Sequence, residues 1–271
     1  PYAFGYGGAT PMEDPFLYGP NMTPPATNPY APQTPFFGGI NGPQPFRFGY
    51  VPRLDIGYIP EAPVKDFNSN VEMFELDTEL KYTSPFSTGW VFSSTPEFDY
   101  RAWNFDGPLS PLYRVNLYRF GWDMELYKLK SNGWTWNFAF NPSINTDGEH
   151  QTTSDAWNFD ARIAATYQID RVWMVVLGVQ YWDRVDGVVI PHAGVVITPN
   201  DLWEFRLLFP KARISRFVGY FWGGHHWMYA SSEYNVEAYQ IDLSTVGSSP
   251  RNRVQYEDWR LALGLRSDHG W

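Results

Sequence analysis

From about residue 46 onward, the sequence alternates apolar and polar residues with a period of two. Residues 71–83, VEMFELDTELKYT, put apolar side chains on one face (Phe74, Leu76, Leu80, Tyr82) and charged ones on the other (Glu75, Asp77, Glu79, Lys81). Successive side chains of a β-strand point to opposite faces. The pattern therefore predicts strands whose two faces meet different environments.

The same alternation recurs along the rest of the chain. It is found in residues 118–126, 134–141, 159–168, 173–181, 203–209 and 259–266, with turn sequences such as Ser-Asn-Gly and Pro-Asn-Asp between the runs. No long segment has the period of a helix, and no repeat of fixed length indicates a propeller or solenoid. We expect an all-β domain at 46–271 with about twelve antiparallel strands, preceded by a distinct segment at 1–45.

Alternation alone fits both a soluble β-sandwich and a transmembrane β-barrel. Strand runs of roughly ten residues match the length that a tilted membrane strand needs. Aromatic residues also close the ends of the apolar faces, as rings at two membrane interfaces would. The candidates for such interface positions are Phe74, Tyr82, Trp122, Trp134, Trp173, Tyr181, Trp203 and Trp259. These features favour an antiparallel transmembrane β-barrel.

If the apolar faces meet lipid, the polar faces must line the barrel lumen. The candidate lumen-lining residues are Glu75, Asp77, Glu79, Lys81, Asp123, Glu125, Asp160, Arg162, Glu204, Arg206, Arg260 and Arg266. Side chains of mixed sign can pair across strands and fill a narrow lumen, whereas an unpaired acidic excess would favour cations in an open one. About twelve strands lie between filled and channel-forming barrels, so the strand count leaves both outcomes open.

Composition excludes several classes of protein. The formal charge of −9, with no cluster of Lys or Arg, argues against a nucleic-acid binder. The chain has no cysteine, which removes disulfides and thiolate metal sites. The longest strongly apolar run, residues 172–179, is too short for a membrane helix. Without an initiator Met or an apolar leader, the sequence is consistent with a product exported after signal-peptide removal.

We expect the first 45 residues, which are rich in Pro, Gly and aromatic residues and whose only charges are Glu13 and Asp14, to form an extended segment. Proline disfavours helices and central strands. A plain flexible linker is one interpretation. Its aromatic density favours docking on a partner or inside its own barrel. The candidate docking residues are Tyr2, Phe4, Tyr6, Phe16, Tyr18, Tyr30, Phe36 and Phe37.

Residues 189–214, VIPHAGVVITPNDLWEFRLLFPKARI, carry a recognisable combination of motifs. A Pro-x-x-Gly strand (Pro191, Gly194) precedes a Thr-Pro-Asn turn at 198–200 and the strand Trp-x-Phe-x-Leu-x-Phe-Pro at 203–210, followed by Arg213. In these motifs the chain resembles a family of uncharacterised outer-membrane β-barrel proteins of planctomycete-type bacteria, over about residues 50–271. The resemblance implies a fold and an outer-membrane location, and no catalytic chemistry.

Few residues point to catalysis or metal binding. His225 and His226 are adjacent, so on a strand they point to opposite faces and are poorly placed to share a metal; His150, His192 and His269 have no ligand spacing. A barrel enzyme acting on lipid could use His226 with Ser231 or Ser232 and Glu233, but no nucleophile motif surrounds them. We therefore expect no enzyme activity, metal or cofactor.

The sequence thus predicts a barrel in the outer membrane of a Gram-negative-type bacterium, in contact with outer-membrane lipid. Its function would be a narrow passive pore that mildly favours cations, or a structural component of an assembly with other subunits through the N-terminal segment. The alternatives are a soluble extracellular β-sandwich that binds glycans through surface aromatics, and the lipid-modifying enzyme.

Overall fold

The computed structural model describes residues 3–4, 48–64, 68–107, 114–129, 134–149, 152–170, 172–200, 202–241 and 252–268. Apart from one 3₁₀ turn, η2 (Ser154–Ala156), their regular structure consists of β-strands. In chain order the strands are β1 (Ala3–Phe4), β2 (Gly49–Pro63), β3 (Asn70–Ser87), β4 (Trp90–Phe105), β5 (Arg114–Leu129), β6 (Trp134–Thr146), β7 (Trp157–Gln168), β8 (Trp173–Trp182), β9 (Val188–Pro191), β10 (Ala193–Asn200), β11 (Trp203–Phe209), β12 (Lys211–Phe221), β13 (Gly224–Ile241) and β14 (Asn252–Asp268). No helix in the described ranges is long and apolar enough to cross a membrane.

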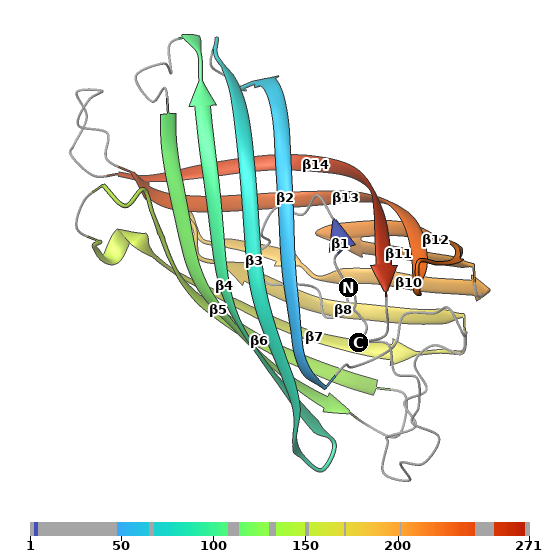
Figure 1. The fold of residues 1–271 in the computed structure, drawn as a ribbon. Coiled ribbons are helices and arrows are strands. Elements are labelled where there is room, and N and C mark those ends of the chain that lie inside the picture. Colours follow the sequence, from blue (N-terminus) through green and yellow to red (C-terminus); the bar gives the residue numbers. More distant parts are fainter. Residues whose placement is uncertain are drawn as a thin grey trace.

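The strands form one sheet in which neighbours along the chain pair antiparallel, in the order β1-β14-β13-β12-β11-β10-β8-β7-β6-β5-β4-β3-β2 (Figure 1). β9 also pairs with β8, so β9 and β10 are two parts of one pass that is interrupted at His192. The sheet therefore has 14 strands, whereas the sequence predicts about twelve. The difference arises from this interruption and from β1, a strand in a segment where we expected none.

The motif-rich region around residue 194 shows why glycine is needed there. Gly194 has φ +153°, and a Cβ at this position would lie 2.0 Å from the backbone oxygen of Leu207 on the paired strand β11. Only a residue without a side chain permits this approach. The glycine of the Pro-x-x-Gly motif is thus explained by backbone packing between β10 and β11.

Burial along the strands is inverted relative to a soluble protein. In β4 the buried residues on one face include Ser93, Thr95, Glu97, Asp99 and Arg101. Outward faces elsewhere carry large apolar side chains, and Leu261 and Leu263 of β14 are 84% and 78% exposed. The period of two is therefore confirmed, with the polar face turned inward and the apolar face turned outward.

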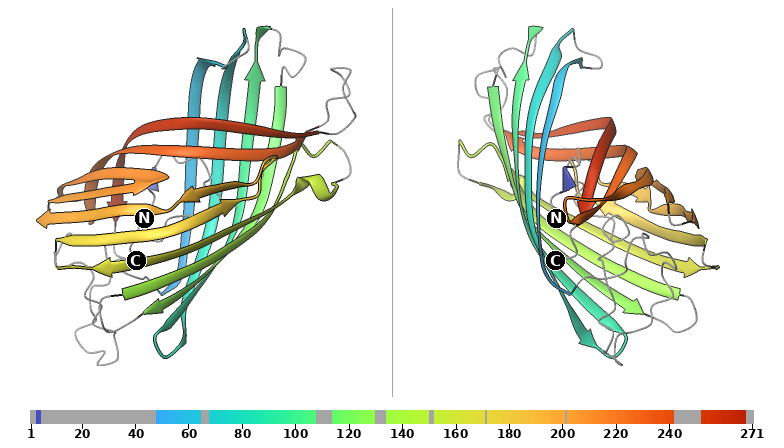
Figure 2. Two further views of the ribbon diagram at one scale, coloured as in Figure 1. Left: turned by 180° about the vertical axis from the view of Figure 1, so that it is seen from behind. Right: turned by 45° about the vertical axis from the view of Figure 1, so that its right-hand side comes forward.

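Beyond Glu233, the last residue of β13 that pairs with β12, the hairpin formed by β13 and β14 leaves the wall and crosses the interior. In Figures 1 and 2, β13 and β14 run across the upright strands β2 to β5, on the side that faces β6 to β8. Residues 235–241 of β13 are buried without the usual alternation, because both faces of this segment are covered. On one face Arg101 of β4 reaches Glu237, and on the other Val236 packs with Trp182 of β8 and Ile190 of β9.

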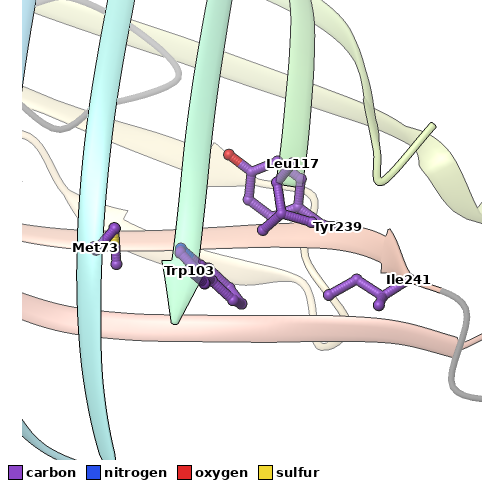
Figure 3. Packing of buried hydrophobic residues seen from close by; sticks show 5 residues of the cluster. All are labelled: Met73, Trp103, Leu117, Tyr239 and Ile241. Atoms are coloured by element: carbon purple, nitrogen blue, oxygen red, sulfur yellow. The ribbon is translucent and has the colours of Figure 1, made fainter. Parts of the chain in front are cut away.

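An apolar cluster packs where the hairpin crosses the wall (Figure 3). Met73 of β3, Trp103 of β4 and Leu117 of β5 contact Tyr239 and Ile241 of β13. The rings of Trp103 and Tyr239 meet edge to face, with centroids 6.1 Å apart. This end of the interior is consequently filled by a small hydrophobic core.

Closure of the sheet differs from that of a regular antiparallel barrel. Gln240 of β13 pairs parallel with Thr146 of β6, and this contact closes a ring that contains β6, β7, β8, β10, β11, β12 and β13. Within the described strands, β2 has no ladder with β14; β1 pairs with β14 at Arg266 and Leu265 and also contacts β2. The expectation of a purely antiparallel barrel is therefore corrected, because β13 crosses the lumen to reach β6.

Candidate functional site

The inward face of the sheet is the candidate site, and it is organised into groups of ion pairs. The first group is centred on Arg101 of β4, which is fully buried. Its guanidinium contacts Asp77, Glu75 (Nε to Oε1, 3.5 Å) and Glu237 (Nη2 to Oε1, 3.4 Å). Arg260 of β14 also contacts Glu75, at 3.0 Å. Because Glu237 and Arg260 belong to the hairpin, these pairs hold it against β3 and β4.

The second group is centred on Arg119 of β5. Nη1 of Arg119 donates to Asp99 at 2.7 Å, and Nη2 lies 2.7 Å from Glu97. Nη2 also donates to the side-chain oxygen of Asn141 at 3.0 Å, and the Asn141 amide donates to Glu97 at 3.0 Å. Each charged group therefore has an opposite charge or an amide as a partner, as burial requires.

The third group is centred on Glu125 of β5. Its carboxylate accepts hydrogen bonds from Lys81 at 2.8 Å, Arg162 at 2.7 Å and the Tyr127 hydroxyl at 2.6 Å. These donors come from β3, β7 and β5 itself, so the group links strands that lie two apart along the inward face of the sheet. Asp123, two residues before Glu125, is buried on the same face.

Smaller groups complete the interior. Arg184, in the turn after β8, forms two hydrogen bonds with Asp160 of β7 (2.8 and 3.1 Å) and donates to the backbone oxygen of Val236 at 2.6 Å. Lys211 pairs with Glu233 at 2.8 Å. Glu204 of β11 accepts from both Arg206 and Arg213.

These groups make the interior a packed polar core. Two charges gain from pairing in a low-dielectric interior, although their desolvation offsets much of the gain. Removing one partner of such a pair typically costs about 3–5 kcal/mol. The paired groups can therefore rigidify the barrel and oppose the passage of solutes. An inward charge without an opposite charge beside it can discriminate ions by their charge.

The structure places all the candidate lumen-lining residues on the inward face. Eight of them are buried (Glu75, Asp77, Asp123, Glu125, Asp160, Arg162, Glu204, Arg206), and four are half-buried (Glu79, Lys81, Arg260, Arg266). Sequence reasoning missed Arg101, Asp99 and Glu237, although each lies in a run with period two. It also missed Arg184, which lies in a turn where no periodicity marks it.

The candidate interface aromatics lie on the outward face. Phe74, Tyr82, Trp122, Trp173, Tyr181 and Trp259 are exposed, and Trp134 and Trp203 are half-buried. Several form ladders with neighbouring rings, as Trp203 does with Phe205 at 5.7 Å. The β12–β13 turn adds Trp222, which is 83% exposed and which sequence reasoning did not single out.

Most of the N-terminal docking candidates lie outside the described residues: Tyr2, Tyr6, Phe16, Tyr18, Tyr30, Phe36 and Phe37. The backbone of Phe4 lies in β1, opposite Leu265 of β14. The docking interpretation therefore stays a prediction.

The residues considered for catalysis and metal binding do not come together. His226 is buried, with Nε2 2.7 Å from the backbone oxygen of Phe221 and its ring stacked on Phe221. Ser231 lies five positions along the same strand and therefore on its other face. Ser232 lies six positions away, roughly 20 Å along the strand, and Glu233 pairs with Lys211. No group of three or more His, Cys, Asp or Glu residues that could hold a metal occurs in the described residues.

No family model and no curated protein matches the chain. Among solved structures, the toluene transporter TodX of P. putida is similar in fold, with a TM-score of 0.45 and 8% sequence identity, over 74% of this chain and 70% of that chain.

Proposed function

We propose that the protein is an outer-membrane β-barrel with a filled interior, which acts as a structural component of the membrane. The observation that carries this proposal is the inverted burial: charged side chains such as Arg101 and Glu125 are buried, while Leu261 and Leu263 are largely exposed. A monomeric soluble protein rarely exposes a contiguous apolar patch larger than a few hundred Å². Lipid is the solvent in which this distribution is favourable.

The filled interior favours a structural role over a passive pore. The β13–β14 hairpin crosses the lumen, and the cluster around Trp103 and Tyr239 packs on one side of it. Ion pairs on Arg101, Arg119 and Glu125 occupy the polar face. A conducting pore needs a continuous aqueous path, and neither packed feature provides one.

Association with other subunits through the N-terminal segment is the second part of the proposal. It is supported by the composition of residues 1–45, in which aromatic and proline residues are frequent and Glu13 and Asp14 are the only charges. Burying these aromatic rings against a protein surface would lower the free energy of the segment.

The membrane proposal is tested by placing a charge on the outward face. An arginine at Leu263, which is 78% exposed, should lower the free energy of unfolding by about 2–4 kcal/mol if the position lies near the bilayer midplane. The control is Thr88→Arg, in the exposed β3–β4 turn, which should change it by less than about 0.5 kcal/mol. Both variants are refolded into lipid vesicles and unfolded with urea.

The gel mobility of unheated samples reports the folded barrel in the same experiment. A wild-type chain that fractionates with membranes and migrates differently before and after boiling supports the proposal. A Leu263→Arg variant as stable as Thr88→Arg, in a chain that stays monodisperse without detergent, would instead support the soluble β-sandwich.

A further inference from the structure

We propose that the barrel interior contains a binding site for a small oxyanion, centred on Arg206 of β11. The site is distinct from the structural role proposed above, because it depends on the interior face alone and not on what surrounds the barrel. The ligand class is a phosphate, sulfate or carboxylate group.

Arg206 is fully buried and only partly bonded. Its Nε donates to Oε1 of Glu204 at 2.5 Å. Its two terminal NH₂ groups, Nη1 and Nη2, have no hydrogen-bond partner among the described residues. Burying a guanidinium whose two NH₂ groups have no hydrogen-bond partner costs desolvation free energy. An anion that accepts hydrogen bonds from both groups would offset that cost.

The surrounding charges favour an anion at this position. Arg213 of β12 lies directly opposite Arg206 in the β11–β12 ladder, and its Nη2 donates to the same Glu204 oxygen at 3.2 Å. The charge of Arg266 on β14 also acts on Glu204. Two arginines thus contact one carboxylate, although like charges directly opposite each other normally destabilise a sheet.

Apolar neighbours strengthen the electrostatic field at the site. Val196 of β10 is paired with Arg206, and Leu208 lies two residues further along the same face of β11. Both belong to a buried cluster with Met174 and Val176 of β8. In such a low-dielectric environment, charges attract an oxyanion more strongly than they would in water.

Other buried arginines do not share this feature. The terminal NH₂ groups of Arg119 contact Asp99, Glu97 and Asn141. Those of Arg101 contact Asp77 and Glu237. Among these arginines, two terminal NH₂ groups without a partner in the described residues are therefore found at Arg206. The planar fork of the guanidinium matches two oxygens of a phosphate or carboxylate.

The test measures binding of radiolabelled inorganic phosphate to the purified full-length chain in detergent, by equilibrium dialysis at constant ionic strength. Arg206→Gln should lower the affinity for phosphate at least tenfold. Arg206→Lys keeps the charge but not the fork, and should give an intermediate value. The matched control is Arg216→Gln, which removes an exposed arginine of β12 that lies over the Trp203 ring at 5.3 Å and should keep the wild-type affinity.

A second variant allows for competition from the chain itself. Glu13 and Asp14 are the only carboxylates in the first 45 residues, so E13Q/D14N is measured in parallel. Phosphate binding to E13Q/D14N but not to the wild type would support the site and show that these carboxylates compete with phosphate for it. No phosphate binding to either the wild type or E13Q/D14N would overturn the proposal, and so would an Arg206→Gln variant that binds as tightly as the wild type.

Discussion

Arg101 is the residue whose removal most directly tests the packing of the hairpin against the wall. Its buried guanidinium contacts Asp77 and Glu75 on β3 and Glu237 on the hairpin. In Arg101→Ala, Glu75 keeps Arg260 and Glu237 keeps its hydrogen bonds from Asn235 and Tyr239. Asp77 loses the single ion pair that it makes among the described residues.

At least one buried carboxylate is therefore left uncompensated, which typically costs about 3–5 kcal/mol. That value is a large part of the 5–15 kcal/mol that stabilises an ordinary domain. The assay is urea unfolding of the barrel in lipid vesicles, followed by tryptophan fluorescence. Two matched variants separate charge from packing: Arg101→Met alone, and Arg101→Met combined with Asp77→Asn and Glu237→Gln.

The combined variant removes the unpaired charges and keeps similar side-chain volumes, so it should recover at least half of the stability lost in Arg101→Met. A loss of less than about 1 kcal/mol in Arg101→Ala would refute the argument that this group holds the hairpin. Equal losses in Arg101→Met and the combined variant would mean that the missing packing of the guanidinium, not the uncompensated charge of the buried carboxylates, causes the effect.

Two further predictions concern transport and assembly. In planar bilayers the wild-type barrel should show no steady conductance because the hairpin crosses its lumen, and a stable cation-selective current would restore the pore interpretation. Deleting residues 1–45 should leave the heat-dependent gel mobility intact but release the barrel from larger complexes, as measured by the particle mass in native detergent extracts; an unchanged mass would exclude assembly through this segment.

Local sequence information was sufficient for the strands and their faces. In residues 71–83 the alternation of Phe74 and Leu76 with Glu75 and Asp77 already assigns the outward and inward sides, because a strand has only two faces. The same argument could have found Asp99 and Arg101 in β4. Arg184 could not be found in this way, since its role follows from a turn that brings it to Asp160 and Val236.

The partners of the inward side chains were not predictable. Alternation shows that Arg101 and Glu237 each belong to a polar face, but they are separated by 136 residues along the chain. Likewise, the local sequence does not distinguish Arg206, whose terminal NH₂ groups have no partner among the described residues, from Arg119, whose NH₂ groups are hydrogen-bonded. Only the register of neighbouring strands and the curvature of the sheet decide which charges meet.

The sequence by itself therefore determined an all-β chain with charged inner and apolar outer faces, because these properties follow from the two-residue period of a strand. The tertiary structure decided that the end of the β13–β14 hairpin crosses the interior, that β13 reaches β6, and which inward side chains pair with one another. The physical reason is that residues 235–241 are covered on both faces by side chains from distant parts of the chain, with Arg101 on one face and Trp182 on the other. Such long-range contacts depend on how the whole sheet bends, and no short stretch of sequence carries that information.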